Sequence, residues 1–212
     1  MHEILEKIRE IGIVPVVALK DAKDALPLAK ALQQGGLPCA EITFRTEAAA
    51  ESIRLIAREC PKMLVGAGTV LTVEQADQAV EAGAKFMVSP GFNPRVVKHC
   101  LERGILITPG CSTPTDIEQA LENGLDVVKF FPAEPAGGLR MLRALAAPYG
   151  RVQFMPTGGI GPANVGEYLR YKRVLACGGS WMAKAELIKA GAFEEIQRLS
   201  REAAQIVKES RG

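Results

Sequence analysis

The chain has 212 residues, of which 48% are hydrophobic, and its 26 basic and 24 acidic side chains leave a formal net charge of +2. This balance of charge argues against nucleic acid as a partner, and the hydrophobic content is sufficient for one well-buried core. Length and composition therefore predict a single globular domain that spans residues 1–212.

The first residues, MHEILEKIREIG, alternate charged and apolar side chains at helical spacing. A signal peptide would have an uninterrupted apolar segment here. A transmembrane helix needs about 20 apolar residues, and no stretch of the sequence approaches that length. We therefore expect a cytoplasmic protein that does not interact with membranes.

The five cysteines are an odd number and widely scattered, without a CxxC pair, and there are two histidines. This pattern argues against a disulfide framework and against a zinc cage. A metal-dependent mechanism would have to rely on carboxylates alone, so we predict no metal site.

Short apolar runs recur along the chain, with segments of helical spacing between them. The runs occupy residues 14–19, 39–44, 64–70, 86–90, 105–110, 126–131, 152–159 and 174–180. Several of the intervening segments begin with a Ser, Thr or Asp that can cap a helix. Strands separated by helices pair in parallel, because antiparallel neighbours need only short hairpins. The eight units predict an α/β fold, a (β/α)8 TIM barrel, with residues 2–10 as an extra N-terminal helix against its N-terminal mouth.

An open doubly wound sheet is the alternative architecture, and it would carry a nucleotide-binding fingerprint after its first strand. The sequence KDAKDA follows the first run instead. The single GxG, at Gly66 and Gly68, lacks a third glycine and lies within the third run, and no GxxxxGK[ST] motif occurs. We therefore favour the barrel.

Charged residues near two strand ends suggest an active site, because a parallel barrel builds its site at the carboxyl ends of its strands. Alternation in CAEITFRTE places Glu41, Thr43 and Arg45 on the face that we expect to point inward. Lys129 lies near the end of DVVKFFP, where an unpaired buried ammonium would cost several kcal/mol. The structural alternatives are an internal Glu41–Arg45 ion pair that fills the barrel, and a Lys129 amine that reaches water at its mouth.

Glycine pairs end the seventh and eighth runs, in TGGI (residues 157–160) and GGS (residues 178–180). Paired glycines let backbone amides approach an anion closely, and the loops after strands seven and eight commonly bind phosphate in barrels. Tight turns would explain each pair equally well. Two pairs at neighbouring positions nevertheless favour a phosphorylated ligand.

The Lys129 amine can add to a ketone, and the resulting imine draws electrons from the adjacent carbons, so that a carbon–carbon bond breaks without a cofactor. Burial against Phe130 and Phe131, with a second cation such as Arg45, would favour the neutral amine. Glu41 can move protons between the intermediate and the substrate hydroxyl. Arg45 and Thr69 can bind a substrate carboxylate.

The motifs EITFRTE, GAGTV, SPG, VKFFPAE, PTGGI and GGSW, in this order, resemble those of the 2-keto-3-deoxy-6-phosphogluconate (KDPG) aldolases, also called 4-hydroxy-2-oxoglutarate (KHG) aldolases. The resemblance covers nearly the whole chain. It implies a class I aldolase, a carbon–carbon lyase of the Entner–Doudoroff pathway, that forms pyruvate and glyceraldehyde 3-phosphate. It also implies a homotrimer without a metal or other cofactor.

By this resemblance each site residue has an expected role. Lys129 is the Schiff-base lysine and Glu41 the acid/base, while Arg45 and Thr69 bind the carboxylate. The further substrate-binding residues are Pro90 and Phe131 along the pocket, Thr157 near the hydroxyls, and Gly158, Gly159, Gly179 and Ser180 around the phosphate. Cys111 stands where we expect an apolar residue in this family, and it could alter the pocket shape or act as a reactive thiol.

Three alternatives remain open at this point. The main substrate could be unphosphorylated 4-hydroxy-2-oxoglutarate or the galactonate epimer, since one hydroxyl-binding residue discriminates by a few kcal/mol at most. The same phosphate-binding barrel could serve an isomerase or decarboxylase in which Lys129 donates protons. The third alternative is a barrel that binds a carboxylate or phosphate without catalysis.

Overall fold

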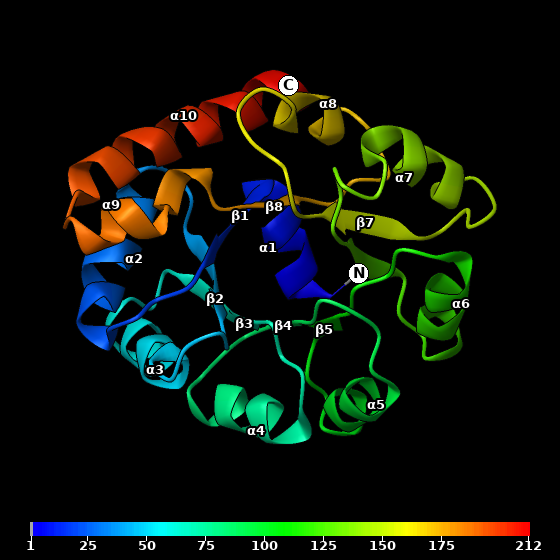
Figure 1. The fold of residues 1–212 in the computed structure, drawn as a ribbon, viewed down its shortest axis with the longest axis horizontal. Coiled ribbons are helices and arrows are strands. Elements are labelled where there is room, and N and C mark those ends of the chain that lie inside the picture. Colours follow the sequence, from blue (N-terminus) through cyan, green and yellow to red (C-terminus); the bar gives the residue numbers. More distant parts are fainter. Residues whose placement is uncertain (1) are drawn as a thin grey trace.

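The computed structural model of the chain describes residues 2–212, in which short strands alternate with helices (Figure 1). The strands are β1 (Ile13–Val17), β2 (Cys39–Thr43), β3 (Leu64–Gly68), β4 (Met87–Val88), β5 (Ile107–Thr108), β6 (Val127–Phe130), β7 (Gln153–Pro156) and β8 (Cys177–Gly179). Each of the eight predicted apolar runs overlaps one of them, and β1 begins one residue before its run.

The helices cover the outside of the strands, except for α1 (Figure 1). They are α1 (Glu3–Ile11), α2 (Ala25–Gln34), α3 (Ala49–Glu59), α4 (Val73–Glu81), α5 (Pro94–Glu102), α6 (Pro114–Glu122), α7 (Gly138–Ala146), α8 (Val165–Leu169), α9 (Ala185–Lys189) and α10 (Phe193–Arg211), with short 3-10 turns η1 (Ala22–Asp24) and η2 (Trp181–Ala183). Thr72, Asn93 and Thr113 cap α4, α5 and α6 through their side chains, and these caps satisfy amides that a helix start leaves free.

The strands form a curled parallel sheet in the order β5-β4-β3-β2-β1-β8, and β6 pairs with β7. Isolated parallel bridges continue the pairing from Gly110 to Lys129, from Phe154 to Val174 and from Thr157 to Gly178. The neighbours of β6 are therefore β5 and β7, and the neighbours of β7 are β6 and β8. This alternation of parallel strands and helices is a TIM-like (β/α) fold.

Alternating side chains of the strands enter two separate apolar clusters. In β6, Val128 and Phe130 join the large cluster that includes the outer helices. Val127 joins a smaller inner cluster, and Lys129 shares its inward side. Complete burial of side chains of this size stabilises a fold by about 1.5–3 kcal/mol each. This apolar packing fixes which side of β6 carries the amine.

Helix α1 lies in the middle of the curled strands in Figure 1. Its buried residues Leu5 and Ile8 belong to the inner cluster, together with Val14 at the start of β1 and Cys39 at the start of β2. The helix therefore covers the amino-terminal ends of the strands with apolar side chains, and the polar residues collect at the opposite ends. Within residues 2–212, no helix combines the length and apolar character that crossing a bilayer requires.

Candidate active site

Lys129 of β6 and Glu41 of β2 meet in the interior of the curled strands. The Lys129 Nζ atom donates to Glu41 Oε1 across 3.4 Å, and the two side chains are 5% and 2% exposed. The amine is therefore buried and paired, so the interpretation of Lys129 as a side chain that reaches water is wrong. Removing either member would leave the other charge without its partner in a poorly solvated place.

The aromatic neighbour of the amine is Phe131, whose ring centroid lies 5.2 Å from Lys129 Nζ. This distance is within the range in which a ring face attracts a cation. Phe130 was expected beside the amine as well, but it is fully buried in the outer cluster. Successive side chains of a strand point to opposite faces, so Lys129 and Phe130 cannot share one.

A glycine provides the space that the Glu41 side chain occupies. Strand β3 pairs with β2, with Gly66 opposite Glu41 and Gly68 opposite Thr43. A methyl group at Gly68 would overlap the Glu41 carboxylate. Gly68 thus leaves room for the carboxylate and fixes where it can lie.

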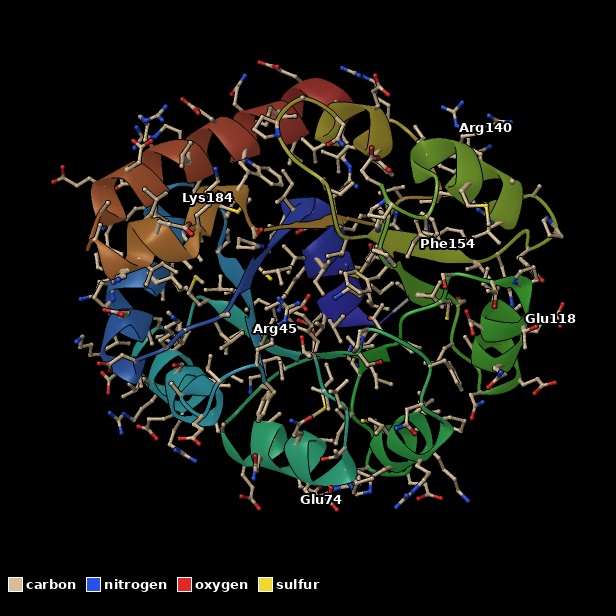
Figure 2. The ribbon with its side chains drawn as sticks, in the orientation of Figure 1. Arg45, Glu74, Glu118, Arg140, Phe154 and Lys184 are labelled. Atoms are coloured by element: carbon tan, nitrogen blue, oxygen red, sulfur yellow. The ribbon has the colours of Figure 1, made fainter. Side chains whose placement is uncertain are left out.

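Arg45 and Thr69 are in contact at the carboxyl ends of β2 and β3. The Arg45 Nε atom donates to Thr69 Oγ1 across 3.3 Å, and Figure 2 shows Arg45 near the middle of the view. Because this bond uses Nε, both terminal nitrogens of the guanidinium remain free to bind a carboxylate. Thr69 has a φ of 55°, a backbone conformation that costs a side-chain-bearing residue about 1–2 kcal/mol.

A cavity of about 270 Å³ lies between Arg45 and the glycine pairs. Seven of the predicted residues line it: Arg45, Phe131, Thr157, Gly158, Gly159, Gly179 and Ser180. Ser180 is exposed, whereas the Thr157 side chain is largely buried. The cavity therefore brings the predicted carboxylate-binding and phosphate-binding residues together around one space.

The two glycine pairs require glycine for different structural reasons. Gly158 and Gly159 have φ values of 101° and 77°, which suit glycine because it lacks a Cβ. Gly178 and Gly179 lie in strand β8, where a methyl group would overlap Thr157 or the ring of Trp181. Close packing thus explains the second pair. Because these residues have no side chain, their backbone atoms line the cavity directly.

Four predicted residues do not line the cavity itself: Glu41, Thr69, Pro90 and Lys129. Lys129 borders it through Phe131, and Thr69 through Arg45. Pro90 follows β4, and a methyl group at Gly110 would overlap its carbonyl group. Because Gly110 also bridges to Lys129, Pro90 is held close to the strand that carries the amine.

Sequence reasoning missed several cavity residues that have no reactive group. Val16, Val17, Ala18 and Ile160 line the cavity with Gly178, and no chemical signal in the sequence distinguishes them from core residues. Thr43 also lines it, and its hydroxyl donates to the Val17 carbonyl across 3.0 Å. Alternation had placed Thr43 inward without a role.

Cys111 does not reach the cavity. It is 1% exposed and belongs to the outer cluster. Burial, followed by the nearby Asp116 carboxylate, raises the pKa of the Cys111 thiol to about 12. A thiol is reactive as the thiolate, so the suggestion of a reactive thiol is wrong. Cys111 does not line the cavity, so its side chain does not shape the pocket directly. Among residues 2–212, no three His, Cys, Asp or Glu side chains are grouped so that they could hold a metal ion.

Comparison with known proteins identifies relatives over almost the whole chain. A sequence model described as KDPG and KHG aldolase matches residues 4–199. A 2-dehydro-3-deoxy-phosphogluconate aldolase of Treponema pallidum is 56% identical and covers 98% of this chain and 99% of its own length. A KHG/KDPG aldolase of Escherichia coli K12 is 46% identical, with 91% of each chain covered.

A solved structure agrees with these sequence matches. The KDPG aldolase of Legionella pneumophila, with pyruvate captured at low pH as a covalent carbinolamine intermediate, superposes with a TM-score of 0.90. It is 37% identical and covers 93% of this chain and 96% of its own. The chain therefore belongs to the family of KDPG and KHG aldolases.

Proposed function

We propose that this protein is a class I aldolase that cleaves 2-keto-3-deoxy-6-phosphogluconate into pyruvate and glyceraldehyde 3-phosphate through a Schiff base on Lys129. The observation that carries the proposal is the buried contact between Lys129 Nζ and Glu41 Oε1 at 3.4 Å. The name of the family and that of the Treponema pallidum relative include a phosphorylated keto acid. The cavity has Arg45 at one end for a carboxylate and the Gly158–Gly159 turn at the other for a phosphate.

In the first step the Lys129 amine adds to the substrate ketone carbon, and the carbinolamine loses water to give a protonated imine. Glu41 is the group next to the amine, so its carboxylate takes a proton from the Lys129 ammonium before the addition and later gives that proton to the hydroxyl, which leaves as water. In the relative from Legionella pneumophila, pyruvate was captured as a covalent carbinolamine. This is the same kind of intermediate that we propose on Lys129.

In the second step Glu41, now a carboxylate, accepts the proton of the substrate hydroxyl, directly or through one water. The neighbouring carbon–carbon bond breaks, its electron pair moves into the imine to form an enamine, and the aldehyde leaves. Protonation of the enamine carbon and hydrolysis of the imine then release pyruvate and restore the amine. No cofactor is required at any step.

Substrate orientation follows from the polar groups at the two ends of the cavity. The planar guanidinium of Arg45 can bind the keto-acid carboxylate in a bidentate manner, with Thr69 holding the side chain in place. Pro90 and Phe131 border the ketone, and Thr157 lies near the substrate hydroxyls. The backbone at Gly158, Gly159 and Gly179, together with Ser180, binds the phosphate.

Borohydride reduction in the presence of pyruvate tests the covalent step. Peptide mass mapping should find pyruvate attached to the peptide that contains Lys129. An isomerase or decarboxylase in which Lys129 donates protons would give no trapped adduct. A non-catalytic binding protein would give no trapped adduct and would also turn over no substrate. Absence of an adduct in the folded protein would refute the proposal.

Unphosphorylated 4-hydroxy-2-oxoglutarate is the second candidate substrate, because the Escherichia coli relative carries both substrates in its name. Comparison of kcat/KM on the two substrates and on the galactonate epimer decides among them. We expect the phosphorylated gluconate substrate to be preferred. An equal or higher value on 4-hydroxy-2-oxoglutarate would overturn the assignment of the glycine pairs to phosphate binding.

We further infer that residues 1–212 form one closed (β/α)8 barrel domain with α1 as an extra N-terminal helix. The bridges from Gly110 to Lys129 and from Thr157 to Gly178 support closure. Family resemblance supports a homotrimer, which sedimentation analysis would test. It also supports a role in the Entner–Doudoroff pathway, and we propose a cytoplasmic location.

A further inference from the structure

The turn that contains Gly158 and Gly159 is held from two sides. The Glu134 amide donates to the Gly158 carbonyl across 3.0 Å, and the Ala133 amide donates to the Thr157 carbonyl across 2.8 Å. On the other side, Asn164 Nδ2 donates to the Gly159 carbonyl across 3.0 Å. The first two bonds come from the segment that follows Lys129 and Phe131, and the third comes from the residue before α8.

One side-chain hydrogen bond joins these two anchors. The hydroxyl of Tyr168, in α8, donates to the Glu134 carboxylate. The Tyr168 residue is 1% exposed, whereas Glu134 is exposed. Burial, followed by the contact with Glu134, raises the pKa of Tyr168 above its usual range, so the hydroxyl keeps the proton that it donates.

The space around this hydrogen bond is tightly packed. A methyl group at Gly159 would lie 2.5 Å from Glu134 Cβ, and one at Gly138 would lie 3.0 Å from Glu134 Oε1. The Glu134 side chain thus fills the gap between the glycine turn and the start of α7. A phenylalanine would fill the core equally well at position 168, so core packing does not account for a hydroxyl bonded to a charged group outside the core.

We propose that Glu134 and Tyr168 are a positioning pair that fixes the Gly158–Gly159 turn relative to the Lys129 end of the site and thereby sets the preference for a phosphorylated substrate. The inference rests on the proposed aldolase function. Neither residue touches the cavity. The pair acts through the turn, whose backbone amides must be placed correctly to bind phosphate.

The test measures kcat and KM of the Tyr168→Phe and Glu134→Ala variants on 2-keto-3-deoxy-6-phosphogluconate and on 4-hydroxy-2-oxoglutarate. Each variant should raise KM for the phosphorylated substrate about three- to tenfold. This range assumes that part of the stabilisation from the charge-assisted hydrogen bond positions the glycine turn. KM for the unphosphorylated substrate should change by less than about twofold. Glu134→Gln should restore the wild-type ratio, because an amide oxygen can still accept from Tyr168.

A second tyrosine–glutamate pair provides the matched control. The Tyr149 hydroxyl donates to Glu118 Oε1 across 3.0 Å, and Tyr149 precedes β7, on the amino-terminal side of the strands. Tyr149→Phe should leave the ratio of the two substrates unchanged. Tyr168→Phe or Glu134→Ala could instead lower kcat/KM for both substrates by the same factor, or lower thermal stability while the ratio of the two kcat/KM values stays unchanged. Either result would mean that the pair has a structural role and that the inference is wrong.

Borohydride trapping distinguishes failure of this inference from failure of the proposed function. If wild-type protein traps pyruvate on Lys129 and the variants keep the wild-type ratio, the positioning role alone is refuted. If wild-type protein traps no pyruvate, the aldolase proposal and this inference are both refuted.

Discussion

The two ends of the candidate site use different chemical groups, namely buried side chains at one end and backbone groups at the other. At one end, Lys129 and Glu41 are almost completely buried and interact through their side chains. At the other end, Gly158 and Gly159 offer backbone groups in a turn, next to the exposed Ser180. The chemical step needs groups that are kept from water, whereas a phosphate must enter with its charge and leave again.

This difference predicts how each end responds to substitution. A buried ion pair depends on both partners, so a change at Lys129 or Glu41 affects stability and chemistry together. A backbone site depends on the conformation of a few residues, so changes there should alter binding of one chemical group and leave the chemistry intact. Substitutions at the two ends can therefore separate the two functions.

The largest effect is expected for Lys129→Met. Without the nucleophile, kcat/KM should fall by roughly 10⁴-fold or more, and borohydride should trap no pyruvate. The variant should also lose about 3–5 kcal/mol in its free energy of unfolding, because the Glu41 carboxylate stays buried without its partner. Urea denaturation measures this loss.

The double variant Lys129→Met with Glu41→Gln separates the two effects. It removes both charges, so most of the lost stability should return while activity stays absent. The exposed pair Lys98–Glu102, at 3.7 Å, is a suitable control, since Lys98→Met should change neither activity nor stability appreciably. Recovery of turnover in the double variant would contradict the role of Lys129 as nucleophile.

An intermediate effect is expected for Gly68→Ala, which leaves every reactive group in place. The added methyl group overlaps the Glu41 carboxylate, so the carboxylate must move away from Lys129. We expect kcat to fall at least about tenfold, since small misplacements of reacting groups are costly. Overpacking should also lower the free energy of unfolding by about 1–3 kcal/mol.

The control for this change is Gly150→Ala, because a methyl group there meets no atom within 4 Å. This variant should keep wild-type activity in the same assay. Full activity of Gly68→Ala would mean that the position of the carboxylate is unimportant, and the proposed proton transfer through Glu41 would be wrong.

A smaller and more selective effect is expected for Gly159→Ala. The turn requires a φ of 77° at this residue, which costs alanine about 1–2 kcal/mol, and the added methyl group would also lie 2.5 Å from Glu134 Cβ. We expect KM for 2-keto-3-deoxy-6-phosphogluconate to rise about tenfold, with pyruvate trapping on Lys129 unchanged. Gly161→Ala, where a methyl group meets open space, should leave KM unchanged.

How much could be predicted from sequence also differs between the two ends. Lys129 and Glu41 stand out because charged residues are rare inside apolar strands, and alternation determined that Glu41 points inward. The same alternation shows that Phe130 could not share the face of Lys129, which the sequence analysis overlooked. The eight apolar runs located the strands of residues 2–212, since each run has the length that a short buried strand is expected to have.

The glycine end is harder to interpret from sequence because glycine has several uses. Gly178 and Gly179 leave room for Thr157 and Trp181, and this requirement depends on neighbours that are distant in sequence. Cavity residues such as Val16 and Ile160 were missed for a related reason, since apolar residues at a strand end look the same whether they face a helix or a ligand. The contact of Tyr168 with Glu134 has no local signal at all.

The smallest effect is expected far from both ends, at Asp77 on α4. His99 on α5 contacts its carboxylate at 2.8 Å, and Arg103 pairs with it as well. The hydrogen bond to His99, followed by the charge of Arg103, lowers the pKa of Asp77. A lowered folded-state pKa adds stability above the unfolded pKa of about 3.9, and this stability is lost as the pH falls through the folded value.

Asp77→Asn should therefore lower the urea midpoint slightly at pH 7 and leave it unchanged well below pH ~3, where the wild-type carboxyl group is protonated too. Its kcat/KM ratio for the two substrates should equal that of wild type, because the α4–α5 link contacts neither end of the site. A changed ratio would show that packing of the outer helices reaches the glycine turn. The separation of the site into two independent ends would then be incorrect.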